Sequence, residues 1–239
     1  MIAVFVNMAT VFAGSLIGIF FRNLLKDSMQ KALLFALALC TVVIGVSSAI
    51  ASGDILCVII CMALGTALGE LLRIDDGIEN AGEFLRKKFI KSSGTNSRFT
   101  EGFVSACILF CIGSMTIVGS LEAGIHHDYD IIFAKSTLDF VSSMALGAAM
   151  GIGVTFSVVF ILVMQGGLTL LAGAVGPVLG EAVVTEMSAI GGTILIGMAV
   201  NILELGKTRI KVANMLPAIF LPIVYFPAYD LLRSLLKLI

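Results

Sequence analysis

The stretch Cys111–Ser143, CIGSMTIVGSLEAGIHHDYDIIFAKSTLDFVSS, joins two apolar segments of the chain through a short acidic turn. Its first part ends in glycines and hydroxyl-bearing residues, and the segment that follows begins with Lys135, Ser136, Thr137 and Asp139. Polar groups between segments of bilayer-spanning length need a reason, because burying them in hydrocarbon costs free energy. A solute pathway through a membrane is the interpretation that we favour.

The composition of the whole chain indicates an integral membrane protein. Of its 239 residues, 59% are hydrophobic and 13% are charged, whereas a soluble domain carries about 25% charged residues. The net charge of -1 and the lack of a basic domain argue against nucleic-acid binding. All five cysteines lie in apolar runs, which is not a disulfide framework. The first apolar run starts at Ile2 with no basic residue before it, so we interpret it as a retained helix and not as a cleaved signal peptide.

The apolar runs predict an all-α fold, a polytopic transmembrane helical bundle of about eight spans. One helix over residues 135–178 would be about 66 Å long, twice the thickness of a bilayer. We therefore expect a break in the glycine cluster at 147–153, although a broken or re-entrant element is an alternative. The expected spans are Ile2–Phe21, Ala32–Ala51, Ile55–Leu72, Glu101–Leu121, Lys135–Met150, Gly153–Val178, Ser188–Glu204 and Val212–Tyr229.

The connections between these spans are polar. Residues 52–54 are expected to form a tight reversal, and residues 122–130 and 181–186 to form acidic turns. The long hydrophilic segment 74–100 has apolar residues at helical spacing, which predicts a surface-lying amphipathic helix followed by a flexible loop. Residues 230–239 are expected to form a short amphipathic tail.

The distribution of basic residues predicts the orientation, because cytoplasmic loops are enriched in Lys and Arg. Eight spans with both termini outside a bacterial cytoplasmic (inner) membrane place most of them in cytoplasmic loops. Lys135, Arg233 and Lys237 are the exceptions. The residues placed in the cytoplasm are Arg22, Lys26, Lys31, Arg73, Arg86, Lys87, Lys88, Lys91, Arg98, Lys207, Arg209 and Lys211.

A faint internal repeat divides this single membrane domain. TVFAGSLIG at Thr10–Gly18 is similar to LTLLAGAVG at Leu168–Gly176, with Ala13-Gly14 opposite Ala172-Gly173. Residues 1–73 would form repeat one and residues 153–232 repeat two, so that helices 1–3 match helices 6–8. They would flank the cytoplasmic segment 74–100 and a central helix pair at 101–152. Such copies would have opposite orientations in the membrane, as in many alternating-access transporters.

Lys135 and Asp139 are the leading candidates for a functional site. They are four residues apart and so lie on one face of a helix. Ionisable residues within a span are costly and are usually paired or functional. The alternative for Lys135 is that its long side chain reaches the membrane surface. Asp139 lies about one turn deeper, and its short carboxylate lacks that reach.

Other polar residues within apolar runs are weaker candidates for binding an ion or substrate. The glycines and hydroxyls at the end of the span Glu101–Leu121 either serve helix packing or mark a broken helix whose freed backbone groups line a pathway. Amides also make ordinary interhelical hydrogen bonds. Asn214 precedes Pro217, where a kink is expected. The candidates of this group are Ser136, Ser114, Thr116, Ser120, Asn7, Gln165 and Asn214.

The sequence indicates neither an enzyme nor a metal protein. No H-E-x-x-H, G-x-S-x-G or P-loop motif is present. The cysteine pairs and His126-His127 resemble soft-metal ligands, but buried cysteine is common as a small apolar residue. We expect no metal and no cofactor. The GxxxG patterns that start at Gly14, Gly65, Gly147 and Gly176 indicate helix packing, with a homo-oligomer as one use.

Four motifs together resemble domain-of-unknown-function family 554, a family of bacterial inner-membrane proteins. These are VNMATVFAGSLIG, GSMTIVGSLEAG with KSTLDFVSS, QGGLTLLAG and VANMLPA, and the resemblance covers essentially the whole chain. It implies a membrane location and a transport-like character, and it supplies no substrate. It also implies that the candidate residues above are the polar motif positions of the family. Phe140 departs from the small residue, often glycine, that the family pattern has after the aspartate.

The sequence therefore predicts a secondary transporter of an ion or small polar solute, with lipid as its surroundings. Asp139 would bind a cation or proton, and Ser114, Thr116 and Gln165 would complete the site. A non-transporting membrane scaffold and an ion channel are the alternatives. Substrate, coupling ion and direction of transport are not predicted.

Overall fold

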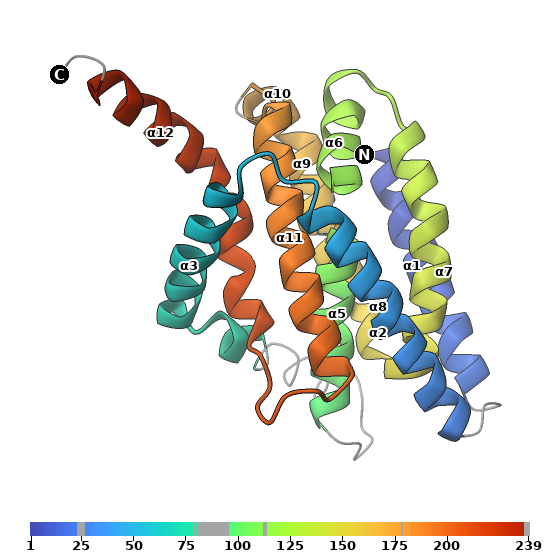
Figure 1. Cartoon of the computed structure of the whole chain (residues 1–239). Helices are drawn as coiled ribbons and strands as arrows, with labels where there is room; N and C mark the ends of the chain where they lie inside the picture. Colours follow the sequence, from blue (N-terminus) through green and yellow to red (C-terminus); the bar gives the residue numbers. More distant parts are fainter. Residues whose placement is uncertain (23–26, 79, 81–95, 112–113, 178, 237–239) are drawn as a thin grey trace.

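The computed structural model describes residues 1–22, 27–78, 80, 96–111, 114–177 and 179–236. Every secondary-structure element in this part of the chain is helical (Figure 1). The elements are α1 (Ile2–Arg22), α2 (Asp27–Ala49), α3 (Ile55–Leu72), α5 (Asn96–Cys111), α6 (Ser114–Ile125), α7 (Asp130–Met150), α8 (Gly153–Ile161), the π-helix η1 (Leu162–Gly166), α9 (Gly167–Leu170), α10 (Ala172–Val175), α11 (Glu181–Ile202), the 3₁₀-helix η2 (Val212–Phe220) and α12 (Pro222–Leu236).

Several of these helices are long and apolar enough to cross a membrane. Five qualify alone: α1, α3, α7, α11 and the run Gly153–Val175 from α8 to α10. The count rises to seven if each of two bent pairs, α5 with α6 and η2 with α12, forms one span. The apolar part of α2, Phe35–Ala49, is shorter. Length and composition thus support five to seven of the eight expected spans.

The faces that point away from the bundle are apolar, as a lipid environment requires. Phe5, Phe12 and Phe20 of α1 are about half exposed or more, and Leu64 and Leu72 of α3 are also exposed. In a soluble protein, an apolar surface of this extent would drive aggregation. The bundle is therefore that of a membrane protein.

The structure corrects several predicted boundaries. The expected span Glu101–Leu121 is two helices, α5 and α6, whose axes are bent by 58°, which agrees with the broken-helix alternative. The predicted acidic turn at 181–186 is wrong, because these residues form the first turns of α11. The predicted tail continues α12 as far as Leu236. Most of the predicted amphipathic segment 74–100 lies outside the described residues.

Other expectations are confirmed. α3 has the predicted bounds, and α7 ends in the glycine cluster, where Gly151 takes a φ of 84° that favours glycine. The last span is bent, although the 45° break lies between η2 and Pro222 and not at Pro217.

Close helix packing depends on small residues. A Cβ atom on Gly18 of α1 would lie 2.0 Å from the carbonyl oxygen of Met144 in α7, and one on Gly45 of α2 would lie 2.7 Å from that of Gly192 in α11. One on Gly69 of α3 would lie 1.9 Å from a carbonyl oxygen of η2. These contacts pair α1 with α7, α2 with α11 and α3 with η2.

The GxxxG glycines are used within the chain. Gly14 and Gly147 lie in the contact between α1 and α7, Gly65 faces Ala218, and Gly176 faces the side chain of Ile125. Their close approach is thus explained by packing inside one copy, and it gives no support to the expected homo-oligomer.

The two ends of the bundle differ in charge. We call the end at which α1 begins the upper end and the opposite end the lower end (Figure 1). The acidic residues of the upper turns and helix starts are Asp54, Glu122, Asp128, Asp130, Glu181 and Glu186. The described basic residues at or near the lower end are Arg22, Lys31, Arg73, Lys207, Arg209 and Lys211.

Candidate functional site

A buried ion pair on α7 is the centre of the candidate site. Lys135 and Asp139 are 6% and 7% exposed, and the Lys135 ammonium group donates a hydrogen bond to Asp139 Oδ2. Their four-residue spacing places both on the buried stripe of the helix, as the sequence predicts. The ammonium nitrogen also lies 6.0 Å from the centre of the Phe110 ring, within the range of a cation–π contact. Lys135 therefore does not extend to the membrane surface.

Two amide side chains from other helices complete this cluster. Asn7 Nδ2 of α1 donates to Asp139 Oδ2 at 3.1 Å and to Gln165 Oε1 at 3.0 Å. Both amides are fully buried. The structure thus brings together four of the nine predicted residues, and the hydrogen bonds of Asn7 span 132 positions to Asp139 and 158 positions to Gln165. We call Asn7, Lys135, Asp139 and Gln165 the polar cluster.

Gln165 lies in an interruption of regular helix. Residues 162–166 form a π-helix, and the chain then passes through the four-residue helices α9 and α10. Single π-helical turns inside α-helices occur frequently at functional sites. Irregular backbone at membrane depth is tolerated where protein covers it or where it lines a cavity. The sequence shows only two glycines at this place, Gly166 and Gly167, and the predicted span Gly153–Val178 therefore does not include this break.

Some buried polar atoms of the polar cluster and of α6 and α9 have no hydrogen-bond partner in the described part of the chain. They are Asn7 Oδ1 and Gln165 Nε2 in the cluster, Ser120 Oγ on α6 and Thr169 Oγ1 on α9. Buried polar groups are nearly always hydrogen-bonded, so these four atoms are the unusual feature of this region. α6 packs on α9, where Gly124 approaches the backbone of Thr169.

The other predicted residues have different surroundings. Thr116 donates to the Phe110 carbonyl at 3.1 Å and so satisfies a group at the end of α5. Ser136 donates to the Ile132 carbonyl within α7. The side chain of Ser114 lies outside the described residues. Asn214 is not in the polar cluster, since it lies in η2.

Asn214 belongs to a polar contact at the lower end that we call the lower clasp. It accepts a hydrogen bond from the Asp75 backbone N–H at 2.7 Å and donates to Glu70 Oε2 at 2.5 Å. Lys211 adds a longer contact to Glu70 at 3.5 Å. The clasp joins the end of α3 to the start of η2.

A matching contact at the upper end, the upper clasp, was not predicted. The Glu186 carboxylate is 2% exposed and accepts three hydrogen bonds from the turn between α2 and α3: Ser52 Oγ at 2.7 Å, Gly53 N–H at 2.8 Å and Asp54 N–H at 3.0 Å. Asp54 caps α3 and accepts from the Tyr225 hydroxyl at 3.2 Å. The spacing of Glu186 from the apolar positions 183, 190 and 194 is the signal that could have placed it on a buried helix face.

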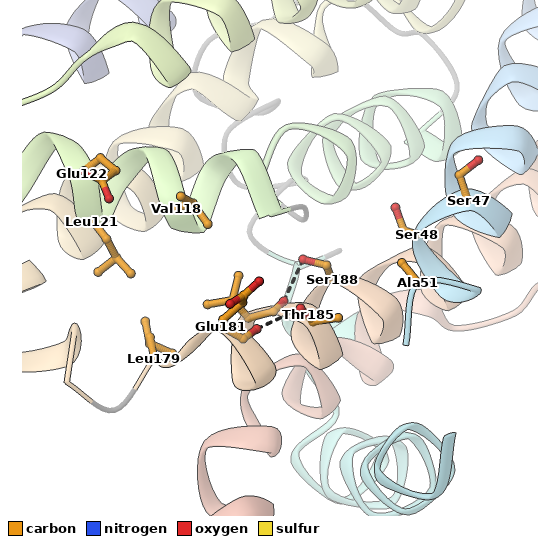
Figure 2. A pocket seen from close by; sticks show the side chains of 11 residues that line it. Ser47, Ser48, Ala51, Val118, Leu121, Glu122, Leu179, Glu181, Thr185 and Ser188 are labelled. Atoms are coloured by element: carbon orange, nitrogen blue, oxygen red, sulfur yellow. Dashed lines mark hydrogen bonds between the residues drawn. The ribbon is translucent and has the colours of Figure 1, made fainter. Parts of the chain in front are cut away.

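A cavity of about 720 Å³ lies near the upper end, between α2, α6 and α11. Figure 2 shows Ser47 and Ser48 of α2 on one side and Glu122 of α6 on another, with Glu181 and Thr185 of α11 between them. Its lining combines hydroxyls and two carboxylates with apolar side chains. α6 thus carries both a wall of this cavity and the buried Ser120.

The described residues contain no group of three or more His, Cys, Asp and Glu side chains that could hold a metal ion. Cys57 and Cys61 are close to each other, with 3.8 Å between their sulfur atoms, and both are buried. Such a pair alone is not a metal centre.

The apolar exterior, the long helices and the buried polar cluster define a multi-pass α-helical membrane protein. A family model described as "Protein of unknown function (DUF554)" matches residues 2–227, and the chain belongs to this family. It is similar to "Uncharacterized membrane protein YdfK" of Bacillus subtilis (strain 168), with 27% identity over 220 residues, 90% of this chain and 91% of that protein. It is also similar to "Uncharacterized protein YqgA" of Escherichia coli (strain K12), with 26% identity over 219 residues, 91% of this chain and 92% of that protein. No solved structure matches the chain.

Proposed function

We propose that the protein is a secondary transporter that moves an ion or small polar solute across the bacterial cytoplasmic membrane through the polar cluster. The observation that carries this proposal is the ion pair Lys135–Asp139, less than a tenth exposed and joined to Asn7 and Gln165. Stability alone does not explain this ion pair, because a protein is often equally stable when apolar residues of similar size replace a buried ion pair. Charges within a membrane commonly mark a solute path.

The arrangement of the helices supports an inverted repeat. The matched dipeptides lie 159 positions apart. At this offset, α2 corresponds to α11 and α3 corresponds to η2. The helices of each corresponding pair pack on each other, as expected if an axis between the repeats relates them. α1 packs on α7, and its counterpart α8 packs on α5, where Gly153 meets the Phe99 carbonyl. Asn7 and Gln165, which touch each other, lie 158 positions apart. A binding site at such an interface is the common arrangement in alternating-access transporters.

The two clasps suit the same mechanism. Adding the repeat offset to residues 52–54 of the upper clasp gives 211–213, which lie in or next to the lower clasp. In each clasp, a residue just before the third helix of one repeat contacts the third helix of the other. Asp54 contacts Tyr225 in the upper clasp, and Lys211 contacts Glu70 in the lower clasp. Opening one clasp while the other stays closed would expose the polar cluster to one side at a time.

The charge of the two ends supports an orientation with the lower end in the cytoplasm. The described basic residues gather there, whereas acidic residues occur at both ends, and it is the distribution of Lys and Arg that indicates the orientation. This orientation places Met1 outside. The cavity near Glu122 and Glu181 would then be an outer vestibule.

A ligand screen tests the proposal. The purified protein in detergent is heated with panels of ions and metabolites, because a ligand at 100 times its Kd stabilises the folded state by about 2.7 kcal/mol. We expect at least one ligand to raise the melting temperature of the wild type and of the exposed-site control Asp128→Asn, and to leave that of Asp139→Asn unchanged. A ligand that stabilises all three proteins equally would contradict a site at Asp139.

The alternatives have less support. An open channel would expose its polar lining to water, whereas Asn7 and Gln165 are fully buried. A scaffold would bind partners through its glycine faces and the cytoplasmic segment 74–100; the glycines that start the GxxxG patterns pack within the chain, and most of the segment lies outside the described residues. Nothing in the polar cluster resembles the nucleophile and base of an enzyme.

A further inference from the structure

The cavity between α2, α6 and α11 is closed at the point where α2 and α11 meet. Ser188 of α11 lines the cavity. One turn further along α11, a Cβ atom on Gly192 would lie 2.5 Å from the Gly45 carbonyl oxygen and 2.7 Å from the Ser48 side chain. This contact forms the floor of the cavity on its side toward the lower end. The volume of about 720 Å³ lies within the range of pockets that bind small organic molecules.

The hydroxyl groups on the α11 wall can accept hydrogen bonds from an occupant but have no hydrogen atom left to donate. Thr185 Oγ1 donates to the Glu181 carbonyl at 2.9 Å, and Ser188 Oγ donates to the Val184 carbonyl at 2.9 Å (Figure 2). A hydroxyl has one hydrogen atom and two acceptor lone pairs. The lone pairs of both oxygens are therefore available to a ligand that donates hydrogen bonds.

The charged groups of the lining are both carboxylates, which also accept hydrogen bonds only. Glu181 lies in the first turn of α11 and Glu122 lies on α6. Glu122 shares a hydrogen bond of 2.7 Å with His126, whereas Glu181 has no ion-pair partner among the described residues. None of the described residues that line the cavity is Lys, Arg or His. A cleft lined by one sign of charge attracts ions of the opposite sign, so this lining favours a cation.

The apolar part of the lining favours an organic cation over a metal ion. Val118 and Leu121 of α6 and Leu179 before α11 give the cavity a hydrocarbon surface. Such a surface stabilises an aliphatic chain and gives nothing to a hydrated metal ion. The described residues also contain no group of three His, Cys, Asp and Glu side chains that could hold a metal ion.

The kind of organic cation follows from the acceptors and from the lack of aromatic rings. Quaternary ammonium ions have no N–H group and are typically bound by aromatic cages. None of the described lining residues is aromatic, whereas carboxylate and hydroxyl oxygens are present on α11. An ammonium group with N–H donors matches these acceptors. A ligand that also carried a carboxylate would be repelled by Glu122 and Glu181.

From these observations we propose that the cavity is a binding site for an aliphatic amine in its ammonium form. The ammonium group donates hydrogen bonds to the Glu181 carboxylate and to the hydroxyl oxygens of α11, and the aliphatic chain lies against Val118 and Leu121 of α6. The site is separate from the polar cluster. The inference therefore goes beyond the proposed transport function and holds whether or not the bound amine crosses the membrane.

Two probes with the same chain and the same charge test the hydrogen bonds. Butylammonium has three N–H donors, like the lysine ammonium group, and butyltrimethylammonium has none. In isothermal titration of the purified full-length protein in detergent, with empty micelles as the blank, butylammonium should bind with saturable heat. Butyltrimethylammonium should bind about tenfold more weakly or less, because hydrogen bonds to charged groups are strong. Butyrate, which has the opposite charge, should not bind.

Three variants locate the site. Glu181→Gln should raise the Kd for butylammonium about tenfold or more, because a charge-assisted hydrogen bond is lost. Thr185→Val removes one neutral acceptor and should raise it by a smaller factor, about two- to fivefold. The control Asp128→Asn removes a carboxylate from the same end outside the cavity lining and should leave the Kd within about twofold. Melting temperatures check that each variant is folded, and the comparison of probes on the wild type tests the inference even if a variant is not.

The outcomes separate the inference from the proposed function. Equal affinities for the two ammonium probes, or wild-type affinity in Glu181→Gln, would overturn the inference. Equal weakening by Glu181→Gln and Asp128→Asn would also overturn it, since the upper end would then attract cations only through its overall charge. Binding of Ca²⁺ without binding of butylammonium would replace it by a metal site. Amine binding that depends on Glu181, with no solute uptake and no ligand that depends on Asp139, would uphold the inference and contradict the transport function.

Discussion

The ion pair Lys135–Asp139 makes a prediction about stability that separates structure from function. Both side chains are less than a tenth exposed, so neither Lys135→Met nor Asp139→Asn leaves the remaining charge in water. Removing one partner of a buried pair costs about 3–5 kcal/mol, whereas replacing both partners is often neutral or stabilising. Each single variant should therefore be less stable than the wild type by about 3–5 kcal/mol, and the double variant by less than about 1 kcal/mol.

Unfolding in detergent, followed by circular dichroism, measures all four proteins in one double-mutant cycle. The expected coupling energy is several kcal/mol, because the two single effects do not add. Asparagine keeps an oxygen that can accept the hydrogen bond from Asn7, which limits the disturbance of the neighbouring amides. If the free energy of unfolding of each single variant lay within about 0.5 kcal/mol of the wild-type value, the reasoning would be refuted. Such a result would mean that water reaches the ion pair.

Three other changes test the packing, the upper clasp and the helix break. Gly69→Ala places a Cβ atom 1.9 Å from the backbone of η2 and should destabilise the protein by about 1–3 kcal/mol in thermal unfolding, whereas Gly173→Ala, which has no atom within 4 Å, should not. Glu186→Gln should speed hydrogen exchange of the amides in the α2–α3 turn by about tenfold or more, because bonds to a charged group contribute about 1.5–3 kcal/mol; unchanged exchange would contradict the clasp. Thr116→Val should cost about 1 kcal/mol by leaving the carbonyl at the end of α5 unpaired, and no loss of stability would mean that water satisfies this group.

Much of the fold could be predicted from the sequence, because apolar runs of bilayer length are a strong signal. The bounds of α3 and the end of α7 were predicted within a residue or two. The break between α5 and α6 was one of two interpretations of this stretch, because glycines and hydroxyl-bearing residues also occur in straight packed helices and the sequence alone does not separate the two. The start of α11 was not predicted. Glu181 and Glu186 resemble loop residues in the sequence, and only the structure shows that Glu186 lies on the buried face of a helix.

The candidate site was predicted in part for a similar reason. The spacing of Lys135 and Asp139 is local, so one helix face could be read from the sequence alone. Their contacts with Asn7 and Gln165 depend on tertiary packing between distant helices. Asn214 was grouped with them because it is polar within an apolar run, yet the structure uses it in the lower clasp. Polarity within a span thus marks candidate residues without showing which of them meet.

The most direct test of the central claim is uptake into proteoliposomes by the wild type and by the double variant Lys135→Met/Asp139→Asn. The solute is the one that stabilises the wild type in the ligand screen. The double variant should be as stable as the wild type and yet take up no more solute than liposomes without protein. Uptake by the double variant at the wild-type rate would contradict the claim that the polar cluster is the transport site.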